Sequence, residues 1–255
     1  IERFEDDLPP GGHAQAVARG VELMRRGELC SLVLSQTFRR QVQVDAAAAF
    51  ARLRRDNPYP AMFFAHLSGG ERVFGASPDV QVRADGQWVE TAPVCGTFRR
   101  GTDPVDDHEQ AKALTHSLVD EASLALCADS DRNDKARVCE PGSVQLLQRR
   151  RVHLFSTIIH TIDHTRGRRR ADVDGFDIVL AHATPATVTG MPKPDARAVI
   201  EALEAGWRGW YAGAAVRFGS DGSCEALTML RFARLVGDWA EVRTGGSLLA
   251  DSDPP

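Results

Sequence analysis

Apolar side chains recur at helical spacing in several stretches of this chain. Between residues 13 and 26, Ala14, Val17, Val21 and Met24 fall on one face and charged residues fall on the other, which predicts an amphipathic helix. The same spacing predicts further helices over residues 46–55, 106–125, 174–181 and 194–205.

Short apolar or alternating runs between these helices predict strands. They cover residues 29–43, 61–66, 71–74, 80–84, 88–91, 144–147, 152–159, 212–218, 225–235 and 239–243. The turn at Asp85-Gly86 favours a hairpin, so we expect residues 61–91 to form an antiparallel meander. Because the strands come in clusters, a parallel doubly wound sheet is disfavoured. We expect an α+β fold, an α/β sandwich of two large antiparallel sheets packed together with helices outside, in a single domain over residues 1–255.

Composition excludes several classes of partner. The net charge of −4 and the lack of a long basic block argue against nucleic acid and lipid surfaces. No apolar stretch approaches the roughly 20 residues that span a bilayer, and the acidic N-terminus is unlike a secretory signal. The five cysteines are widely spaced, without a C-x-x-C pair, which indicates reduced thiols in the cytoplasm and disfavours a zinc site.

The segment Thr187-Val-Thr-Gly-Met-Pro-Lys193 is a candidate anion site. Lys193 follows a Gly-Met-Pro turn just before the helix predicted over residues 194–205, where free backbone N–H groups and the helix dipole favour a negative charge. The alternative is an ordinary loop at a helix N-terminus.

Two further polar segments have alternative interpretations. Residues 96–101, Gly-Thr-Phe-Arg-Arg-Gly, are expected to follow a strand as a turn that could hold a carboxylate. Residues 129–135, Asp-Ser-Asp-Arg-Asn-Asp-Lys, could form a metal or anion site, although a network that ties a helix end to a sheet is favoured.

Two positions within predicted strands and one at a strand end stand out for their residue types. His160 lies in the apolar run over residues 155–162, where a hydrogen-bonded core histidine is the ordinary interpretation. Arg231 lies in the predicted strand over residues 225–235, so its guanidinium needs either a substrate carboxylate or a structural glutamate as its partner. Gly245-Gly246-Ser247 is expected to end a strand, where backbone N–H groups can approach an anion.

The order and spacing of these motifs resemble those of the chorismate-binding enzymes over nearly the whole chain. The motifs are residues 75–79, 91–97, 131–134, 160, 187–193, 208–213, 231 and 245–254. Within that family, the sequence of residues 131–139, 182–190 and 210–213 is most similar to that of the large-subunit (component I) module of anthranilate synthases, especially those fused to a glutamine amidotransferase.

The resemblance implies a Mg²⁺-dependent reaction on chorismate, in the two-sheet sandwich of the family. Ammonia from a glutamine amidotransferase subunit or fused domain adds to the ring, the 4-hydroxyl departs, and pyruvate is eliminated to leave anthranilate, an intermediate of tryptophan biosynthesis. The expected catalytic residues are Asp79, His160 and Thr187, with Asp79 as the general acid. The expected substrate-binding residues are Gly96, Thr97, Lys193, Tyr211, Arg231, Gly245 and Gly246. Asp120 and Glu121 are expected to help bind magnesium.

The chain departs from the family pattern at three positions that bear on activity. Asp79 stands where glutamate is common, Ser123 stands where a second metal-binding glutamate is usual, and Val119 replaces a common lysine. At Ser31, relatives that use water carry a lysine base. Because ammonia needs no such base, Ser31 favours amination.

Three functions therefore stay open from the sequence. The leading hypothesis is an anthranilate synthase. The alternatives are an aminodeoxyisochorismate synthase of secondary metabolism, which stops after amination, and a catalytically degenerate homologue that acts as a binding or scaffold subunit. We expect the chain to be a fragment that lacks an N-terminal regulatory portion and a C-terminal helix. A homodimer is one option for its oligomeric state.

Overall fold

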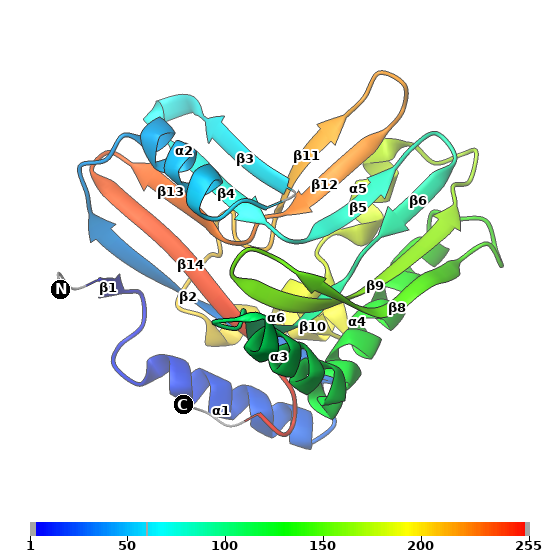
Figure 1. Cartoon of the computed structure of the whole chain (residues 1–255), viewed down its shortest axis with the longest axis horizontal. Helices are drawn as coiled ribbons and strands as arrows, with labels where there is room; N and C mark the ends of the chain where they lie inside the picture. Colours follow the sequence, from blue (N-terminus) through cyan, green and yellow to red (C-terminus); the bar gives the residue numbers. More distant parts are fainter. Residues whose placement is uncertain (1–3, 60, 253–255) are drawn as a thin grey trace. The chain divides into compact units, whose positions relative to one another are not determined.

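The computed structural model describes residues 4–59 and 61–252 (Figure 1). Residues 253 and 254, at the end of the last family motif, lie outside the described residues. The chain divides into two compact units, the first made of residues 1–77, 188–213 and 229–255 and the second of residues 78–187 and 214–228. Within the described part, no helix is both long enough and apolar enough to cross a membrane.

The first unit is built on an antiparallel sheet of seven strands. Its strands are β1 Glu5–Asp6, β2 Ser31–Gln41, β3 Ala61–His66, β4 Arg72–Ser77, β10 Gly190–Met191, β13 Phe232–Val236 and β14 Trp239–Leu248. They run in the order β1-β2-β14-β13-β4-β3, with β10 beside β2. The helices of this unit are α1 Gly12–Arg25, α2 Ala46–Asp56 and α6 Lys193–Leu203, and a 3₁₀ turn covers Ser68–Gly70.

Two apolar clusters attach these helices to the first sheet. Val17 and Val21 of α1 and Ile200 of α6 pack with Leu32 and Leu34 of β2. α2 packs mainly against β4, through a second cluster that includes Ala46, Phe74 and Leu235. Side chains alternate along a strand, so Val33, which lies between Leu32 and Leu34, faces away from the α1–α6 cluster.

The second unit carries the other seven-stranded antiparallel sheet. Its strands are β5 Val80–Ala84, β6 Trp88–Thr91, β7 Val94–Arg99, β8 Gln145–Leu154, β9 Ile158–Arg168, β11 Ala214–Phe218 and β12 Cys224–Thr228. They run in the order β11-β12-β5-β6-β9-β7, with β8 beside β9. The helices are α3 Pro104–His116, α4 Leu118–Ala136 and α5 Gly175–His182, and a 3₁₀ turn covers Ala186–Val188.

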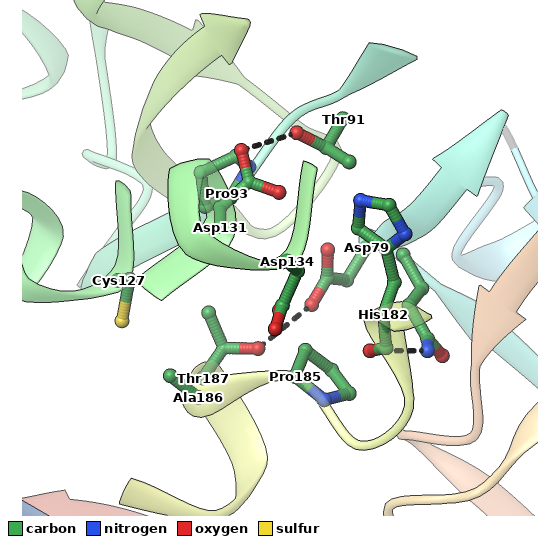
Figure 2. Close-up of a pocket in the computed structure, with 11 residues that line it drawn as sticks. Asp79, Thr91, Pro93, Cys127, Asp131, Asp134, His182, Pro185, Ala186 and Thr187 are labelled. Carbon is green, nitrogen blue, oxygen red and sulfur yellow. Dashed lines mark hydrogen bonds between the residues drawn. The ribbon is translucent and has the colours of Figure 1, made fainter. Parts of the chain in front are cut away.

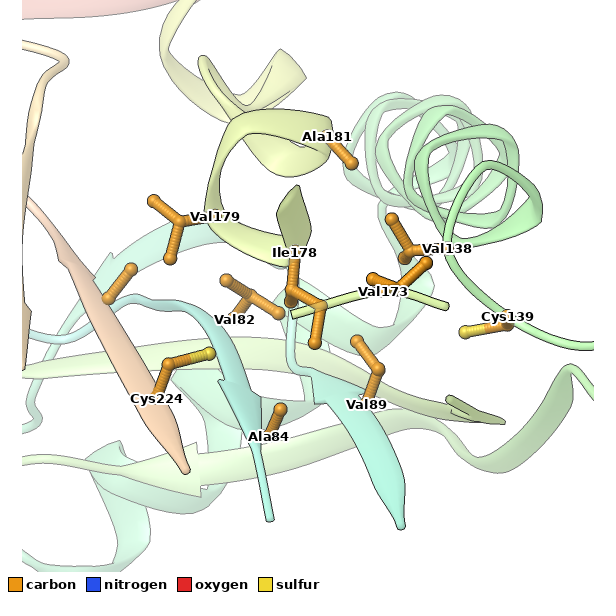
Figure 3. Close-up of a cluster of buried hydrophobic side chains, with 11 residues drawn as sticks. Val82, Ala84, Val89, Val138, Cys139, Val173, Ile178, Val179, Ala181 and Cys224 are labelled. Atoms are coloured by element: carbon orange, nitrogen blue, oxygen red, sulfur yellow. The ribbon is translucent and has the colours of Figure 1, made fainter. Parts of the chain in front are cut away.

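The core of the second unit lies between α5 and its sheet. Figure 3 shows Ile178 and Val179 of α5 near Val82 of β5, with Val89 of β6 and Cys224 of β12 in the same cluster. Asp174 begins α5 with a capping box, in which its carboxylate accepts hydrogen bonds from backbone N–H groups of the first turn. This packing holds the C-terminal end of α5 beside the segment that leads to Thr187.

Two antiparallel sheets with six α-helices in the described part confirm the expected α+β class. The single domain over residues 1–255 stays a prediction.

The helix predicted over residues 106–125 is wrong in its bounds, because two helices occupy this stretch. The chain breaks at Ser117, whose φ of −71° and ψ of 111° are extended, and the Ser117 hydroxyl caps α4 by accepting from the backbone N–H of Asp120. α4 then continues to Ala136, well past the predicted end. The break puts Asp120 and Glu121 in the first turn of a new helix.

Three strand predictions are also corrected. The stretch 225–235 is two strands in different sheets, β12 and β13, separated at Arg231, whose φ is +49°. The meander over residues 61–91 divides in the same way after β4, where Pro78 has no N–H for a ladder. The stretch 152–159 contains the turn between β8 and β9, closed by the bond from Phe155 N to Ile158 O.

Candidate active site

Asp79 and Thr187, two of the three predicted catalytic residues, are in contact. Asp79 is only 4 % exposed and lies just before β5, where its backbone oxygen accepts from Thr228 N. Thr187 lies in the 3₁₀ turn after α5, and its hydroxyl donates to Asp79 Oδ2 over 3.2 Å. The turn thus orients a buried carboxylate (Figure 2).

His160, the third predicted catalytic residue, lies beside Gly96 and Thr97. β7 pairs with β9 so that Thr97 faces His160, and the register shifts at Gly96, whose φ is +74°. Gly96 therefore forms a bulge inside β7, which corrects the expected turn after a strand. His160 Nδ1 lies 2.6 Å from Gly96 O and 3.4 Å from Thr97 Oγ1. Since a carbonyl oxygen only accepts, Nδ1 is the donor of the hydrogen bond to Gly96 O.

The two predicted metal ligands have different neighbours. A Cβ atom built on Gly96 would lie 3.2 Å from Asp120 Oδ1, so the missing side chain of Gly96 makes room for Asp120. Glu121 forms ion pairs with Arg150, at 2.8 Å, and Arg149, at 3.8 Å. Only Asp120 therefore lies beside the Gly96 bulge and the histidine that contacts it.

The acidic segment over residues 129–135 forms the expected network between helix and sheet. Asp131 accepts from Thr91 at 2.6 Å and from Thr165 at 2.7 Å, and its partner one turn later on α4 is Lys135 Nζ at 2.8 Å. Lys135 is fully buried and also contacts Thr91. Burial, the largest single influence, acts to raise the pKa of Asp131, but the electrostatic effects of Lys135 and His182 and the hydrogen bonds from Lys135 and Thr165 together outweigh it and leave that pKa below its usual value. Burial lowers the pKa of Lys135.

A small cavity of about 20 Å³ adjoins the Asp79–Thr187 pair. The described residues that line it are Asp79, Gln81, Thr91, Pro93, Cys127, Asp131, Asp134, His182, Pro185, Ala186 and Thr187. Figure 2 shows its walls coming from α4, the strands and the turn after α5. Gln81 was missed from the sequence, and its only signal is a polar residue between two valines of β5.

Tyr211 and Gly245, two predicted substrate-binding residues of the first unit, approach each other closely. A Cβ atom on Gly245 would lie 2.6 Å from the Tyr211 hydroxyl and 2.7 Å from Leu34 O, so only glycine fits. Gly245 and Gly246 lie within β14 and pair with β2, which corrects their expected place at a strand end. Burial raises the pKa of Tyr211, which therefore stays a neutral hydroxyl.

Arg231 lies in the bend between β12 and β13 rather than inside a strand. Its Nη1 donates to the Tyr59 hydroxyl over 2.6 Å, and its guanidinium lies 5.2 Å from the Tyr59 ring centroid. Its backbone oxygen accepts from Ala76 N. These contacts place the cation against the loop that follows α2.

Lys193 is the first residue of α6, one residue before the predicted start of this helix, and Pro192 precedes it without a side-chain cap. A Cβ atom on Gly246 would meet nothing within 4 Å among the described residues, in contrast to Gly245. The backbone of β14 is therefore open at Gly246.

Buried arginine pairs support the segment that carries Tyr211. Glu204 binds both Arg208 and Arg243, the latter at 2.6 Å, and also accepts from Ser35. Arg243 and Arg208 belong to the lining of a cavity of about 440 Å³. These arginines thus bind a protein carboxylate and hold the segment before Tyr211 against β2 and β14.

The predicted site residues fall into two groups. Asp79, Gly96, Thr97, Asp120, Glu121, His160 and Thr187 belong to the second unit, and Lys193, Tyr211, Arg231, Gly245 and Gly246 belong to the first. Within the second unit the structure joins Asp79 to Thr187, and Gly96 to Thr97, His160 and Asp120. Within the first it joins Tyr211 to Gly245.

Comparison with known proteins agrees with this arrangement of motifs. The chorismate binding enzyme family matches residues 1–255. An anthranilate synthase of Azospirillum brasilense is 44% identical over 97% of this chain and 34% of its own length. Anthranilate synthase component 1 of Streptomyces coelicolor is 34% identical over 97% of this chain and 48% of its own length. The chain thus spans about half or less of these relatives.

Solved structures agree on the fold. Anthranilate synthase component I from Streptococcus pneumoniae superposes with a TM-score of 0.91 and 27% identity, over 99% of this chain and 56% of the other. The menaquinone-specific isochorismate synthase from Escherichia coli superposes with a TM-score of 0.90 and 22% identity, over 99% of this chain and 58% of the other. At this identity the match shows the fold alone. The family match over the full sequence and the order of the motifs lead to one conclusion: the chain belongs to the chorismate-binding enzymes.

Proposed function

We propose that this chain is the chorismate-binding part of an anthranilate synthase, which aminates chorismate with ammonia and then eliminates pyruvate. The observation that carries the proposal is the 44% identity to an anthranilate synthase over 97% of the chain. The Asp79–Thr187 pair and the Tyr211–Gly245 contact support it, because in each a buried polar side chain, Asp79 or Tyr211, lies against a close neighbour.

The second unit supplies the acid chemistry in this proposal. Asp79 protonates the departing 4-hydroxyl, and the Thr187 hydroxyl holds the carboxylate in place through its 3.2 Å hydrogen bond. His160 donates from Nδ1 to Gly96 O, which fixes the orientation of its ring. Thr97 and the Gly96 bulge position that ring, so that His160 can border the substrate ring.

The first unit supplies carboxylate binding. Arg231 offers a planar guanidinium that suits a carboxylate, and Tyr211 offers a hydroxyl that stays protonated. At Gly246 no described side chain covers the backbone of β14, so an anion can approach the main chain there. Lys193, at the N-terminal end of α6, adds a positive charge.

Magnesium fits the carboxylates at the start of α4. Mg²⁺ usually keeps several waters and takes one or two protein carboxylates, which Asp120 and Glu121 can provide. When bound, the ion would neutralise a substrate carboxylate. Asp120 is placed for this beside Gly96, whereas Glu121 would have to exchange its arginine partners for the ion.

Ammonia as the nucleophile is supported at Ser31. This residue is 6 % exposed at the start of β2, and a serine hydroxyl is not a base that activates water. We propose a glutamine amidotransferase, as a separate subunit or a fused domain, as the source of ammonia. A cytoplasmic location and a homodimer stay predictions.

The product assay tests this function. The complete protein is incubated with chorismate, Mg²⁺ and ammonium salt, and the products are separated and followed by fluorescence. Fluorescent anthranilate supports the proposal. A non-aromatic amino acid that retains the enolpyruvyl group identifies an aminodeoxyisochorismate synthase instead.

A degenerate homologue is the second candidate, and the surroundings of Ser123 favour it. Ser123 is 9 % exposed and donates to Cys95 Sγ at 3.7 Å, so it offers no carboxylate to an ion, and Val119 is exposed. Calorimetry with chorismate and Mg²⁺ separates the candidates. Failure of chorismate to bind the native protein even at high Mg²⁺, with turnover restored in the Asp79→Glu, Ser123→Glu variant, identifies a degenerate homologue.

A further inference from the structure

Two cysteine side chains of the second unit lie in contact, although they come from different elements. Cys95 lies in β7, just before the Gly96 bulge, and Cys127 lies near the middle of α4 (Figure 2). Their Sγ atoms are 3.4 Å apart. Since a disulfide bond is about 2.05 Å long, these sulfur atoms are only about 1.4 Å from bonding distance. Among the described residues, no other two cysteine sulfurs are hydrogen-bonded to each other.

The two thiols differ in exposure and in reactivity. Cys95 is partly exposed, so a small molecule can reach its sulfur, whereas Cys127 is 7 % exposed. The hydrogen bond between the two thiols, followed by burial, raises the pKa of Cys127 well above its usual value, so this thiol stays protonated. The Ser123 hydroxyl donates to Cys95 Sγ over 3.7 Å, an interaction that becomes stronger when the sulfur is a thiolate. Cys95 is therefore the thiol that reacts first, and Cys127 is its resolving partner.

The backbone around Cys95 is connected to the groups that position His160. Gly96 follows Cys95 directly, and its carbonyl oxygen accepts from His160 Nδ1 over 2.6 Å. The Cys95 carbonyl oxygen accepts from the Thr161 hydroxyl over 2.8 Å. Gly96 is also tightly packed, because a Cβ atom built on it would lie 2.5 Å from Leu114 Cδ1. A movement of Cys95 toward α4 would therefore displace the Gly96 carbonyl and change the orientation of the His160 ring.

We propose that Cys95 and Cys127 are an oxidation site for a peroxide, and that their disulfide changes the geometry at Gly96 and His160. The site does not depend on which reaction the chain performs. Disulfides that form in reducing compartments are usually transient and redox-sensing, which suits a pair whose thiols are free in the structure. A metal ion is a poorer match, because the described residues contain no group of three or more His, Cys, Asp or Glu side chains placed to hold one.

The oxidation consumes one peroxide molecule and two thiols. With hydrogen peroxide, the Cys95 sulfur forms an S–O bond while the O–O bond breaks, and the other oxygen leaves as water with the Cys95 thiol proton. The Cys127 sulfur then attacks the sulfur of this sulfenic acid. An S–S bond forms, the S–O bond breaks, and the hydroxyl leaves as a second water with the Cys127 proton. The two sulfurs lose two electrons in all, and a dithiol such as dithiothreitol returns them.

Hydrogen peroxide and intact-mass spectrometry test the site in the full protein. The native protein should lose the mass of two hydrogen atoms, peptide mapping should link Cys95 to Cys127, and dithiothreitol should restore the original mass. Cys127→Ala cannot form the disulfide, so it should gain the mass of one oxygen and react with dimedone, a reagent for sulfenic acids. Cys30→Ser is the matched control, because Cys30 is exposed and has no cysteine partner among the described residues. It should cross-link as the native protein does.

Two further measurements follow the effect at His160. In protein labelled with ¹⁵N-histidine, the His160 ring signals, assigned with His160→Gln, should shift on oxidation and return with dithiothreitol. Under the proposed function, anthranilate formation should fall about tenfold or more in the oxidised protein, since small misplacements of active-site groups are costly.

The outcomes separate this site from the proposed function. Oxygen gain without a Cys95–Cys127 link in the native protein would overturn the oxidation site, and this result needs no variant to fold. A link that leaves the His160 signals unchanged would overturn the effect on the Gly96 bulge. If the reduced protein forms no anthranilate, the proposed function fails, and the cross-link and the His160 signals still decide this inference.

Discussion

The hydroxyl of Tyr211 occupies the space that a side chain on Gly245 would need. A Cβ atom at that position would lie 2.6 Å from the hydroxyl oxygen and 2.7 Å from Leu34 O. A glycine in β14 and a tyrosine before β11 therefore depend on each other. The contact brings a buried, neutral hydroxyl against the backbone of a strand, and the proposed carboxylate binding would use this hydroxyl.

Gly245→Ala should destabilise the protein and weaken chorismate binding. Overpacking of this kind costs about 1–3 kcal/mol, and the Tyr211 hydroxyl must move to relieve it. Thermal unfolding and calorimetry with chorismate measure the two effects.

Gly246→Ala is the control for that substitution, because a methyl group there meets open space among the described residues. It should leave the unfolding temperature nearly unchanged. Equal destabilisation by both substitutions would show that the Tyr211 contact is not what requires glycine.

Asp79→Asn should lower kcat of the proposed reaction while KM for chorismate changes little. The amide keeps the size of the carboxylate and can still accept from Thr187, but it is no acid, and general acid catalysis contributes typically 10²–10⁴-fold. Initial rates of anthranilate formation at saturating ammonium give both constants. A rise in KM with unchanged kcat would assign Asp79 to binding instead.

Lys135→Met should be strongly destabilising. The substitution leaves the buried Asp131 carboxylate without its cation, and breaking a buried pair in this way costs about 3–5 kcal/mol. Urea unfolding measures the change in the free energy of unfolding. Arg132→Met on the same helix is the control, since the Arg132 side chain is 65% exposed and its loss should cost little. A similar small loss for both variants would contradict the account.

The order of motifs predicted much of the candidate site, because each motif carries residue types that few other positions share. Asp79 and Thr187, 108 residues apart, were both predicted, and they form a hydrogen bond. Their pairing could be expected only from the family resemblance. Local periodicity says nothing about which distant loops meet.

The missed features have physical causes. Lysine is almost never fully buried, so the burial of Lys135 could not be predicted from its own segment. The apolar run around Arg231 has the pattern of one strand, yet it forms two strands that belong to different sheets. The position of the break between them depends on tertiary pairing, which the local pattern does not contain. Gln81 has the pattern of any polar strand residue, and its place in the wall of the small cavity depends on several separate segments that meet there.

Asp107 should make the stability of the second unit sensitive to acid. The Arg100 guanidinium and the backbone N–H of Gly101 bind its carboxylate and lower its pKa to about 2 from an ordinary value of 3.8. A lowered folded pKa means that this stabilisation is fully present above about pH 4, the ordinary value of an aspartate. It is then lost as the pH falls toward about 2. Asp107→Asn should therefore lower the unfolding temperature at pH 7 and have little further effect at pH 2.

Melting curves of the native protein and Asp107→Asn from pH 7 to pH 2 test whether the stability difference between them decreases as the pH falls. Asp172→Asn is the control, because the Asp172 side chain is 72% exposed in its pair with Arg170 and the solvent screens that interaction. The gap between the melting temperatures of the native protein and Asp107→Asn should close as the pH falls. Protonation of Asp107 in the native protein removes the same negative charge, and so the same interaction with Arg100, that the amide removes in the variant. A gap that stays constant with pH would mean that Asp107 acts through packing at the Gly101 turn rather than through its charge.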